Sequence, residues 1–352
     1  MNISYYLMLF QTDITNALIG GSIMALASTL HLLIKGKITG ISGACFRVVK
    51  GDNFYYNLSF LLGMVFVSAT AKVFYGNSEV FEASSSYISD LSFLGFAISG
   101  FLVGFGTKLA NGCTSGHGVC GLPRLSKRSI VAVLTFCLFG FIFATFRYYC
   151  PFLHRDFLSD IIPMMDYPIM FFLAFAVSIG GYIALVIILG SKKKWDEVRD
   201  ITIAFAVGFL FGYGLLQSGM NCRHRVINFL VISSHWDCTL MFVLGSAVGI
   251  NLITFNCILK YKSSPFYNKS FDLPTNTKVN VKLVIGAAIF GIGWGFAGIC
   301  PGPAVLSSFA YLPHTLAFIG MMSFGQFCAF WSEGWIDKNL GGNEVFKVFK
   351  DN

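Results

Sequence analysis

The sequence predicts an all-α polytopic membrane protein, and two observations carry this prediction. Of the 352 residues, 55% are hydrophobic and only 12% are charged, with a mean hydropathy of +0.69. So little polar material cannot cover soluble domains of this total length. Apolar runs of about 18 to 25 residues, long enough to cross a bilayer, also recur along the chain with short polar gaps between them. We therefore expect lipid to be the solvent of most of the surface.

The apolar runs predict about nine transmembrane helices. We expect them at residues 14–35, 54–75, 91–111, 128–149, 169–190, 200–217, 238–261, 281–299 and 313–331. Two stretches, 38–48 and 219–231, are too short and too polar to cross, so we expect them to be re-entrant. The opening residues lack a basic segment and a small-residue cleavage site, and we expect them to remain in the mature protein.

Positive charge is concentrated in one set of loops. Basic residues follow the odd-numbered spans at Lys37, Arg47, Lys50, Arg124, Lys127, Arg128, Lys192, Lys193, Lys194, Arg199, Lys262, Lys269 and Lys278. The positive-inside rule makes these loops cytoplasmic, with the N-terminus outside and the C-terminus inside, most simply in the plasma membrane. Topology and lipid headgroups then explain the net charge of +8 without a nucleic-acid-binding face.

Two motifs recur in the same order in the two parts of the chain. GFGTKLANGCTSG at 104–116 matches GIGWGFAGICPGP at 291–303, which places Cys113 on Cys300. Upstream, Ser42-Gly43 falls on Ser218-Gly219 at an offset of 176 residues. We expect two repeat halves, 1–168 and 200–352, joined by a connecting span and basic loop at 169–199. Corresponding spans lie an odd number of crossings apart, so the second half is expected to be inverted.

Each repeat motif interrupts a predicted membrane helix at a cysteine. Glycines and a closing proline follow the third span in NGCTSGHGVCGLP, and prolines and glycines end the eighth in GICPGPAV. Backbone that leaves helical geometry at membrane depth must be satisfied by a cavity or a buried joint. Glycines also allow close approach to a ligand, and amides at the next helix N-terminus attract anions. The breaks therefore predict an anion path that contains sulfur.

We expect the breaks and the two re-entrant stretches to line this path. The candidate residues are Cys113, Cys300, Gly112, Thr114, Ser115, Gly116, Pro301, Gly302, Ser42, Gly43, Cys45, Ser218, Gly219 and Met220. Candidates to attract the anion are Lys108, Arg47, Arg223 and Arg225. The predicted spans contain no carboxylate deeper than the terminal Asp200, which disfavours a cation or proton path.

Plainer interpretations of the same residues stay open. Cys113 and Cys300 are also suited to a tight helix crossing that needs small side chains. The four basic residues also suit snorkelling to lipid headgroups. His117 and Cys120 are expected to line the loop, because no metal-like spacing accompanies them.

Three segments resemble the YeeE/YedE sulfur-transport family over nearly the whole chain. They are NGCTSGHG at 111–118, CPGPA at 300–304 and the looser SGM-x(4)-RVINFL at 218–230. The resemblance implies an hourglass-like, inverted-repeat protein of about nine spans that takes up thiosulfate or a related sulfur anion. It also implies that cysteines pass the anion through weak S–H hydrogen bonds, with Cys113 and Cys300 matching the paired motifs. A third cysteine expected on the first span is absent, and Cys45 is a candidate replacement.

The sequence thus predicts a transporter rather than an enzyme, with no cofactor and no metal. Its expected partners are a small sulfur-containing anion, the lipid bilayer and a separate intracellular sulfur-carrier protein. Two alternatives remain: a membrane thiol oxidoreductase that uses Cys113, Cys120 or Cys300 covalently, and an accessory subunit that has lost transport. The absence of a C-x-x-C pair argues against the first, and intact cysteines at both breaks argue against the second.

Overall fold

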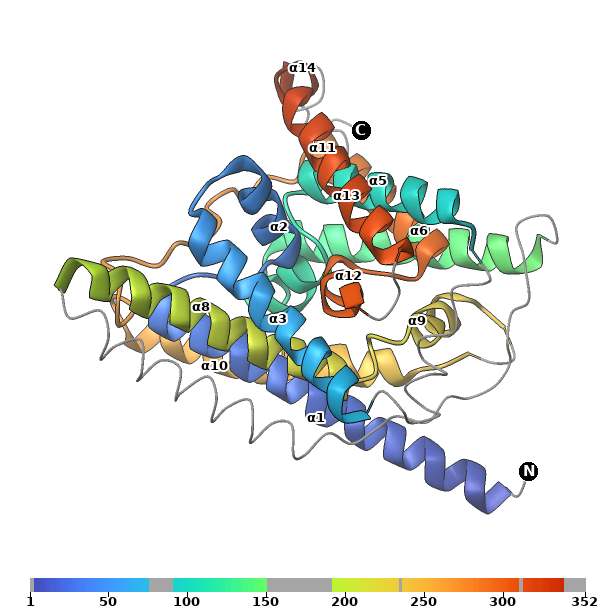
Figure 1. The fold of residues 1–352 in the computed structure, drawn as a ribbon. Coiled ribbons are helices and arrows are strands. Elements are labelled where there is room, and N and C mark those ends of the chain that lie inside the picture. Colours follow the sequence, from blue (N-terminus) through green and yellow to red (C-terminus); the bar gives the residue numbers. More distant parts are fainter. Residues whose placement is uncertain (1–2, 76–90, 151–191, 234–235, 310–312, 339–352) are drawn as a thin grey trace, which may run out of the picture.

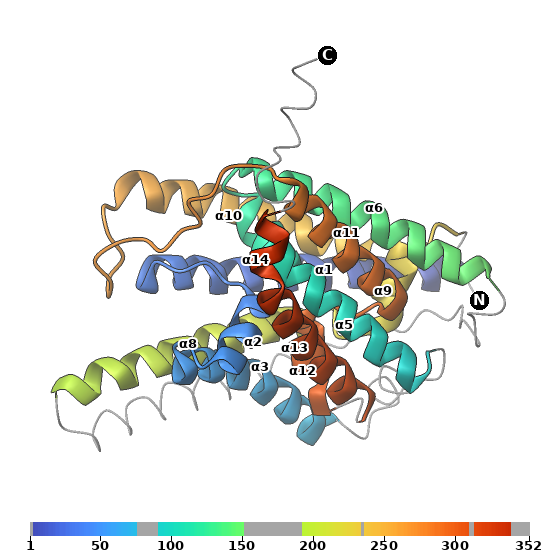
Figure 2. The same ribbon diagram turned by 90° about the horizontal axis from the view of Figure 1, so that it is seen from above.

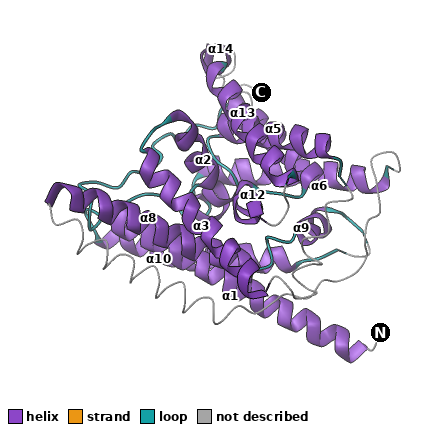
Figure 3. Cartoon of the chain, in the orientation of Figure 1, coloured by secondary structure: helices purple, strands orange, loops and turns teal. Residues whose placement is uncertain are grey.

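The computed structural model describes residues 3–75, 91–150, 192–233, 236–309 and 313–338. These residues are helical apart from loops and one isolated β-bridge between Lys37 and Asp272 (Figure 3). Six of the helices are long and apolar enough to cross a membrane. Some large apolar side chains of these helices, such as Leu134 and Ile253, have most of their surface exposed, which suits contact with lipid. The protein is therefore an integral, multi-pass membrane protein, as the sequence predicts.

Eight of the nine predicted spans coincide with long helices. They are α1 (Ile3–Lys35), α3 (Phe54–Tyr75), α5 (Phe93–Ala110), α6 (Lys127–Tyr149), α8 (Lys192–Gln217), α10 (Thr239–Tyr261), α11 (Val281–Ala297) and α13 (His314–Trp331). The remaining predicted span, 169–190, lies outside the described residues. The short helices are α2 (Ile41–Lys50), η1 (Thr114–Gly121), α9 (Arg223–Leu230), α12 (Pro301–Leu306), η3 (Ser307–Phe309) and α14 (Glu333–Ile336).

Two helix starts differ from the prediction. The basic segment 192–199 was expected to be a loop, but it forms the first turns of α8. Arg199 there pairs with Asp196 at 2.6 Å and with Asp200 at 3.0 Å, so side-chain ion pairs support a polar helix start. Helix α1 begins at Ile3 rather than near residue 14, which brings Asp13 into the candidate span. Asp13 is only 4% exposed and is the first residue of that span, so a buried carboxylate that the prediction did not count lies at its end.

The long helices pack in two groups (Figures 1 and 2). In the first group α1 packs on α8 and α10, and α8 packs on α3; in the second, α5 packs on α11 and α13, and α11 packs on α6. Glycines allow these close crossings. A side-chain carbon at Gly20 would meet the backbone of Gly214, and one at Gly104 would overlap the backbone of Met322. Small residues at crossings are typical of membrane helix pairs.

Except for α14, which contacts α13, the short helices lie between the two groups and contact both. Helix α2 contacts α3 on one side and α5 and α13 on the other, whereas α9 contacts α10 and then α6 and α11. Helix η1 contacts α1 and α10 as well as α6, and α12 contacts α3 and α8 as well as α13. The short helices therefore join the two groups of long helices at the centre of the described residues.

Candidate functional site

Each predicted break places a cysteine directly before a short helix. After α5, Asn111 adopts the left-handed conformation with φ 59°, and Cys113 is the residue before η1. After α11, Gly298 adopts the same conformation with φ 65°, and Cys300 is the residue before α12. A left-handed residue is a common way to end a helix and turn the chain. Both breaks therefore present their cysteine by the same backbone route.

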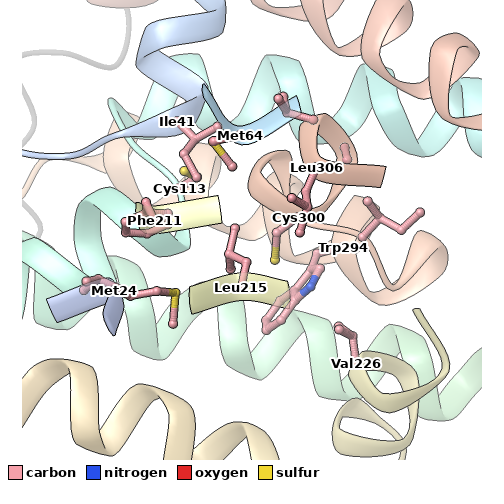
Figure 4. Close-up of a cluster of buried hydrophobic side chains, with 14 of the residues drawn as sticks. Met24, Ile41, Met64, Cys113, Phe211, Leu215, Val226, Trp294, Cys300 and Leu306 are labelled. Atoms are coloured by element: carbon pink, nitrogen blue, oxygen red, sulfur yellow. The ribbon is translucent and has the colours of Figure 1, made fainter. Parts of the chain in front are cut away.

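The two cysteines lie in one buried apolar cluster (Figure 4), and each is 1% exposed. The sulfur of Cys113 lies 3.2 Å from the hydroxyl of Ser115. Thr114, the next residue after Cys113, lines the same cavity as Gly302, the second residue after Cys300. Cys45 is 5% exposed and belongs to the same buried cluster. Three of the predicted path cysteines are thus buried in the core of the described residues.

A cavity of about 430 Å³, here called the basic vestibule, opens beside this cluster. Predicted site residues in its lining are Ser42, Gly43, Arg47, Lys108, Gly112 and Gly116. Lys37 and Asp272 also line it, so three cations face one carboxylate. Burial and the nearby Arg47 lower the pKa of Lys37, and a bound anion would relieve this repulsion. The vestibule therefore suits an anion.

Two further side chains shape the vestibule. Gln326 of α13 donates to the backbone oxygen of Ser42 at 2.9 Å, while its own buried Oε1 has no hydrogen-bond partner among the described residues. Lys108 pairs with Glu333 of α14 at 3.1 Å, and Lys282 donates to the same carboxylate at 2.9 Å. Burial opposes ionisation of Glu333, but hydrogen bonds from Lys282 and Lys108 outweigh it and lower the pKa. The charge of Lys108 is thus partly compensated.

A second cavity of about 120 Å³, here called the apolar chamber, lies behind α2 and η1. Ile41 and Ser115 line the chamber, whereas their sequence neighbours Ser42 and Gly116 line the vestibule. The backbone N–H of Ile41 donates to the Ser115 hydroxyl at 3.2 Å, which fastens this wall. A carbon added at Gly302 would come within 2.8 Å of the Ile41 side chain. The start of α2, the start of η1 and α12 therefore close the space between the two cavities.

Other predicted path residues lie on the chamber side. Thr114, Met220 and Gly302 line the chamber, and the buried Pro301 begins α12. Ser218 is fully buried at the end of α8, where its hydroxyl donates to the Leu215 backbone oxygen at 3.0 Å. Gly219 adopts φ 67° and turns the chain away from α8.

Arg223 and Arg225 line neither cavity. Arg223 donates from Nε to the backbone oxygen of Ala297 at the end of α11, and Arg147 donates to the neighbouring Phe296 oxygen at 2.6 Å. Arg225 pairs with Asp13 at 2.9 Å and contacts Asp237 at 3.5 Å. These contacts satisfy helix-end carbonyls and compensate charge, which is a structural use of the two residues.

His117 and Cys120 bridge η1 to its neighbours. The ring nitrogens of His117 lie 3.1 Å from the hydroxyl of Ser129 and 3.1 Å from the Ala110 oxygen, and Cys120 donates to the Thr39 oxygen at 3.4 Å. No cluster of His, Cys, Asp or Glu suited to a metal occurs in the described residues.

Several site residues were missed from the sequence. Lys37 was counted only as a topology signal, although it lies next to a re-entrant stretch. Gln326 offered a usable signal, because a polar amide inside an apolar span needs an internal partner. Ile41 and Trp294 offered no signal in the sequence, since apolar and aromatic residues are common in membrane segments.

Comparisons with known proteins divide the chain in the same two parts. Residues 14–143 match the family model described as sulphur transport, and residues 199–333 match a family of unknown function, DUF6691. A probable transporter of Xylella fastidiosa (strain Temecula1 / ATCC 700964) is 42% identical over 126 residues, which are 36% of this chain and 84% of the relative. Another probable transporter of that strain is 36% identical over 129 residues, which are 37% of this chain and 91% of the relative.

These relatives are each less than half as long as this chain, yet the chain covers most of their length. The sulphur transport match ends within α6 and so contains α2, the Cys113 break and η1. The resemblance suggested by NGCTSGHG and CPGPA is thereby confirmed, and the chain belongs to the sulphur transport family of the YeeE/YedE type.

Proposed function

We propose that the protein takes up thiosulfate or a related sulfur-containing anion through a central path lined by cysteines. One observation carries the proposal: Cys113 and Cys300 each precede a short helix and lie in one buried cluster, and the sequence neighbours of Cys113 reach both cavities, since Gly112 lines the basic vestibule and Thr114 lines the apolar chamber. Membership of the sulphur transport family and the relatives' description as probable transporters support it. In this proposal the protein is a transporter and not an enzyme.

Two inverted halves would account for the placement of the cysteines. The order of long and short helices is the same in α1-α2-α3-α5-η1-α6 and in α8-α9-α10-α11-α12-α13. In this order α1 corresponds to α8, α3 to α10, α5 to α11 and α6 to α13. Exchanging corresponding helices leaves the packing unchanged: the α1–α10 contact becomes the α8–α3 contact, and the α5–α13 contact becomes the α11–α6 contact. The pairs α1–α8 and α5–α11 map onto themselves. With 169–190 as a connecting span, this pattern supports an hourglass with an axis in the membrane plane.

Basic loops gather on the vestibule side. The backbone N–H of Asp272 donates to the Gly36 oxygen at 2.8 Å, Arg128 donates to the Lys278 oxygen at 2.6 Å, and Arg199 lies 4.3 Å from the ring centre of Tyr267. The segment 262–280 therefore touches the loops before α2 and α6 and the start of α8. We assign this side to the cytoplasm of a plasma membrane, with the N-terminus outside. An imported anion would leave through the vestibule, where a separate sulfur-carrier protein could receive it.

The path would work through weak neutral donors followed by cations. The thiols of Cys113 and Cys300 and the hydroxyls of Thr114 and Ser115 can replace part of the hydration shell of an anion. Weak donors permit release, and Arg47 with Lys37 and Lys108 would then draw the anion into the vestibule. In this proposal Cys45 of α2, whose neighbours Ser42 and Gly43 line the vestibule, serves as a third sulfur.

Uptake of radiolabelled thiosulfate into liposomes that contain the purified chain tests this function. We expect the label to accumulate above the level in protein-free liposomes. Unlabelled thiosulfate should compete more strongly than sulfate, and selenium-containing anions are measured as competitors in parallel. Thiol consumption without accumulation would instead indicate a membrane thiol oxidoreductase. Neither accumulation nor thiol consumption would indicate an accessory subunit that has lost transport.

A further inference from the structure

The apolar chamber contains a polar group to which the path described above gives no role. Trp294 of α11 lines the chamber and is 3% exposed. Its indole Nε1 is buried and has no hydrogen-bond partner within the part of the chain that the structure describes. Figure 4 shows the nitrogen-bearing ring of Trp294 next to Cys300. A buried N–H without a partner destabilises the empty protein, so its presence beside Cys300 calls for a ligand.

The indole is fixed in place by its neighbours. The ring of Phe290 is stacked on it with ring centres 6.2 Å apart, and the ring of Phe136 meets it edge-on at 5.9 Å. On another side, a carbon added at Gly140 would lie only 3.1 Å from the indole. The N–H therefore cannot swing away to find a partner. A donor that is already oriented loses little conformational freedom when it binds an acceptor.

The remaining chemistry of the chamber defines what the N–H can bind. The described lining includes the hydroxyls of Thr114 and Ser115 and the thiol of Cys137, but no Lys, Arg, Asp or Glu. An anion there is stabilised by neutral donors alone, and loss of hydration is then costly. The cost is lowest for a large, polarisable end of the anion, such as a terminal sulfur or selenium, and highest for a compact oxyanion such as sulfate.

We propose that Trp294 is a substrate-binding residue whose indole N–H donates to the terminal sulfur or selenium of the anion on the chamber side of Cys113 and Cys300. This rests on the proposed transport function and adds a selectivity element to it. The indole donor and the Thr114 hydroxyl line the apolar chamber, whereas the cations Lys37, Arg47 and Lys108 line the vestibule. The anion is thus selected by weak neutral donors before it reaches positive charge.

Trp294→Phe tests the proposal, because it keeps an aromatic ring and removes the N–H together with the pyrrole part of the indole. We expect the KM for thiosulfate uptake to rise about tenfold or more. The stabilisation that thiosulfate confers on the purified protein, measured as a shift in Tm, should shrink, and sulfate should compete relatively better. The smaller ring leaves a cavity, so the Tm of the empty protein should fall to some extent, and the change in the thiosulfate-induced shift is the readout that decides.

Trp236→Phe is the matched control, because the Trp236 N–H already donates to the Phe229 oxygen at 2.8 Å away from the path. It should leave KM and the thiosulfate-induced Tm shift unchanged. An unchanged KM in Trp294→Phe would overturn the proposal, as would a lower Tm of the empty protein with a normal thiosulfate-induced shift, which would indicate a packing role. Absence of uptake by the wild-type protein would contradict the transport function. The difference in thiosulfate-induced Tm shift between wild type and Trp294→Phe tests binding by Trp294 independently of transport.

Discussion

The breaks at Cys113 and Cys300 share a backbone route but differ in their surroundings. The first is followed by hydroxyl side chains such as Ser115, and the preceding helix carries Lys108 into the vestibule. The second is followed by two prolines, and the preceding carbonyls accept hydrogen bonds from Arg147 and Arg223. The first break therefore presents polar groups to both cavities, Lys108 to the vestibule and Ser115 to the chamber. The second break is held by hydrogen bonds from arginines. A repeated backbone has acquired two different uses.

Arg47 and Arg223 show the same divergence, since they occupy equivalent repeat positions at an offset of 176 residues. Arg47 is exposed and lines the vestibule. Arg223 is 4% exposed and donates to the Ala297 oxygen. The repeat conserves the residue type while the contacts assign one copy to the cavity and the other to the scaffold.

The largest expected effect follows from breaking the scaffold copy. Arg223→Leu removes a buried donor from the Ala297 oxygen, and an unsatisfied buried acceptor costs about 1–3 kcal/mol of the free energy of unfolding. We expect a clearly lower Tm of the purified protein in detergent and less protein in the membrane. A normal Tm would show that Arg223 does not anchor the second break.

The matched change in the vestibule copy should separate stability from affinity. Arg47→Leu is expected to leave the Tm unchanged, because Arg47 is exposed. The KM for the anion should rise about three- to tenfold, since an exposed cation contributes a modest, screened attraction. The rise should shrink at high salt. Equal losses of Tm in the two variants would contradict the division of roles.

A medium effect is expected where the two breaks meet the wall of the chamber. Gly302→Ala places a carbon 2.8 Å from the flexible end of Ile41 and should push it into the space between the cavities. Overpacking of this kind costs about 1–3 kcal/mol, so uptake should fall about fivefold or more. Gly320→Ala is the control, because nothing lies within 4 Å of the added carbon and Gly320 lines neither cavity. Similar uptake by both variants would mean that the Ile41 wall does not limit the path.

The smallest expected effect concerns the partner of Lys108 on α14. Glu333→Gln leaves Lys108 uncompensated in the vestibule, and the KM should fall about two- to threefold. Because ion pairing lowers the pKa of Glu333, its stabilising contribution is present above about pH 4.3 and is lost as the pH falls through the lowered pKa. Wild-type Tm should therefore drop more than that of Glu333→Gln between pH 7 and pH 3. Parallel curves would exclude this ion pair as a source of stability.

Periodicity and composition were enough to predict most of the helices, because membrane spans depend on apolar length alone. The glycine and proline content of the breaks likewise predicted where Cys113 and Cys300 end helices. The partners of Arg223 and Arg225 could not be predicted, since they come from α11 and α1, far away in the chain. Trp294 was missed for a similar reason: only the packed structure shows that its N–H lacks a partner.

The central claim is that both break cysteines contact the transported anion. Thiosulfate uptake by liposomes containing Cys113→Ala or Cys300→Ala tests it most directly. Cys120→Ala is the control, because Cys120 is a buried cysteine near the first break whose thiol donates to the Thr39 oxygen. We predict that each break variant elutes as a folded protein but transports no more than protein-free liposomes, whereas Cys120→Ala retains uptake. Normal uptake by both folded break variants would contradict the account.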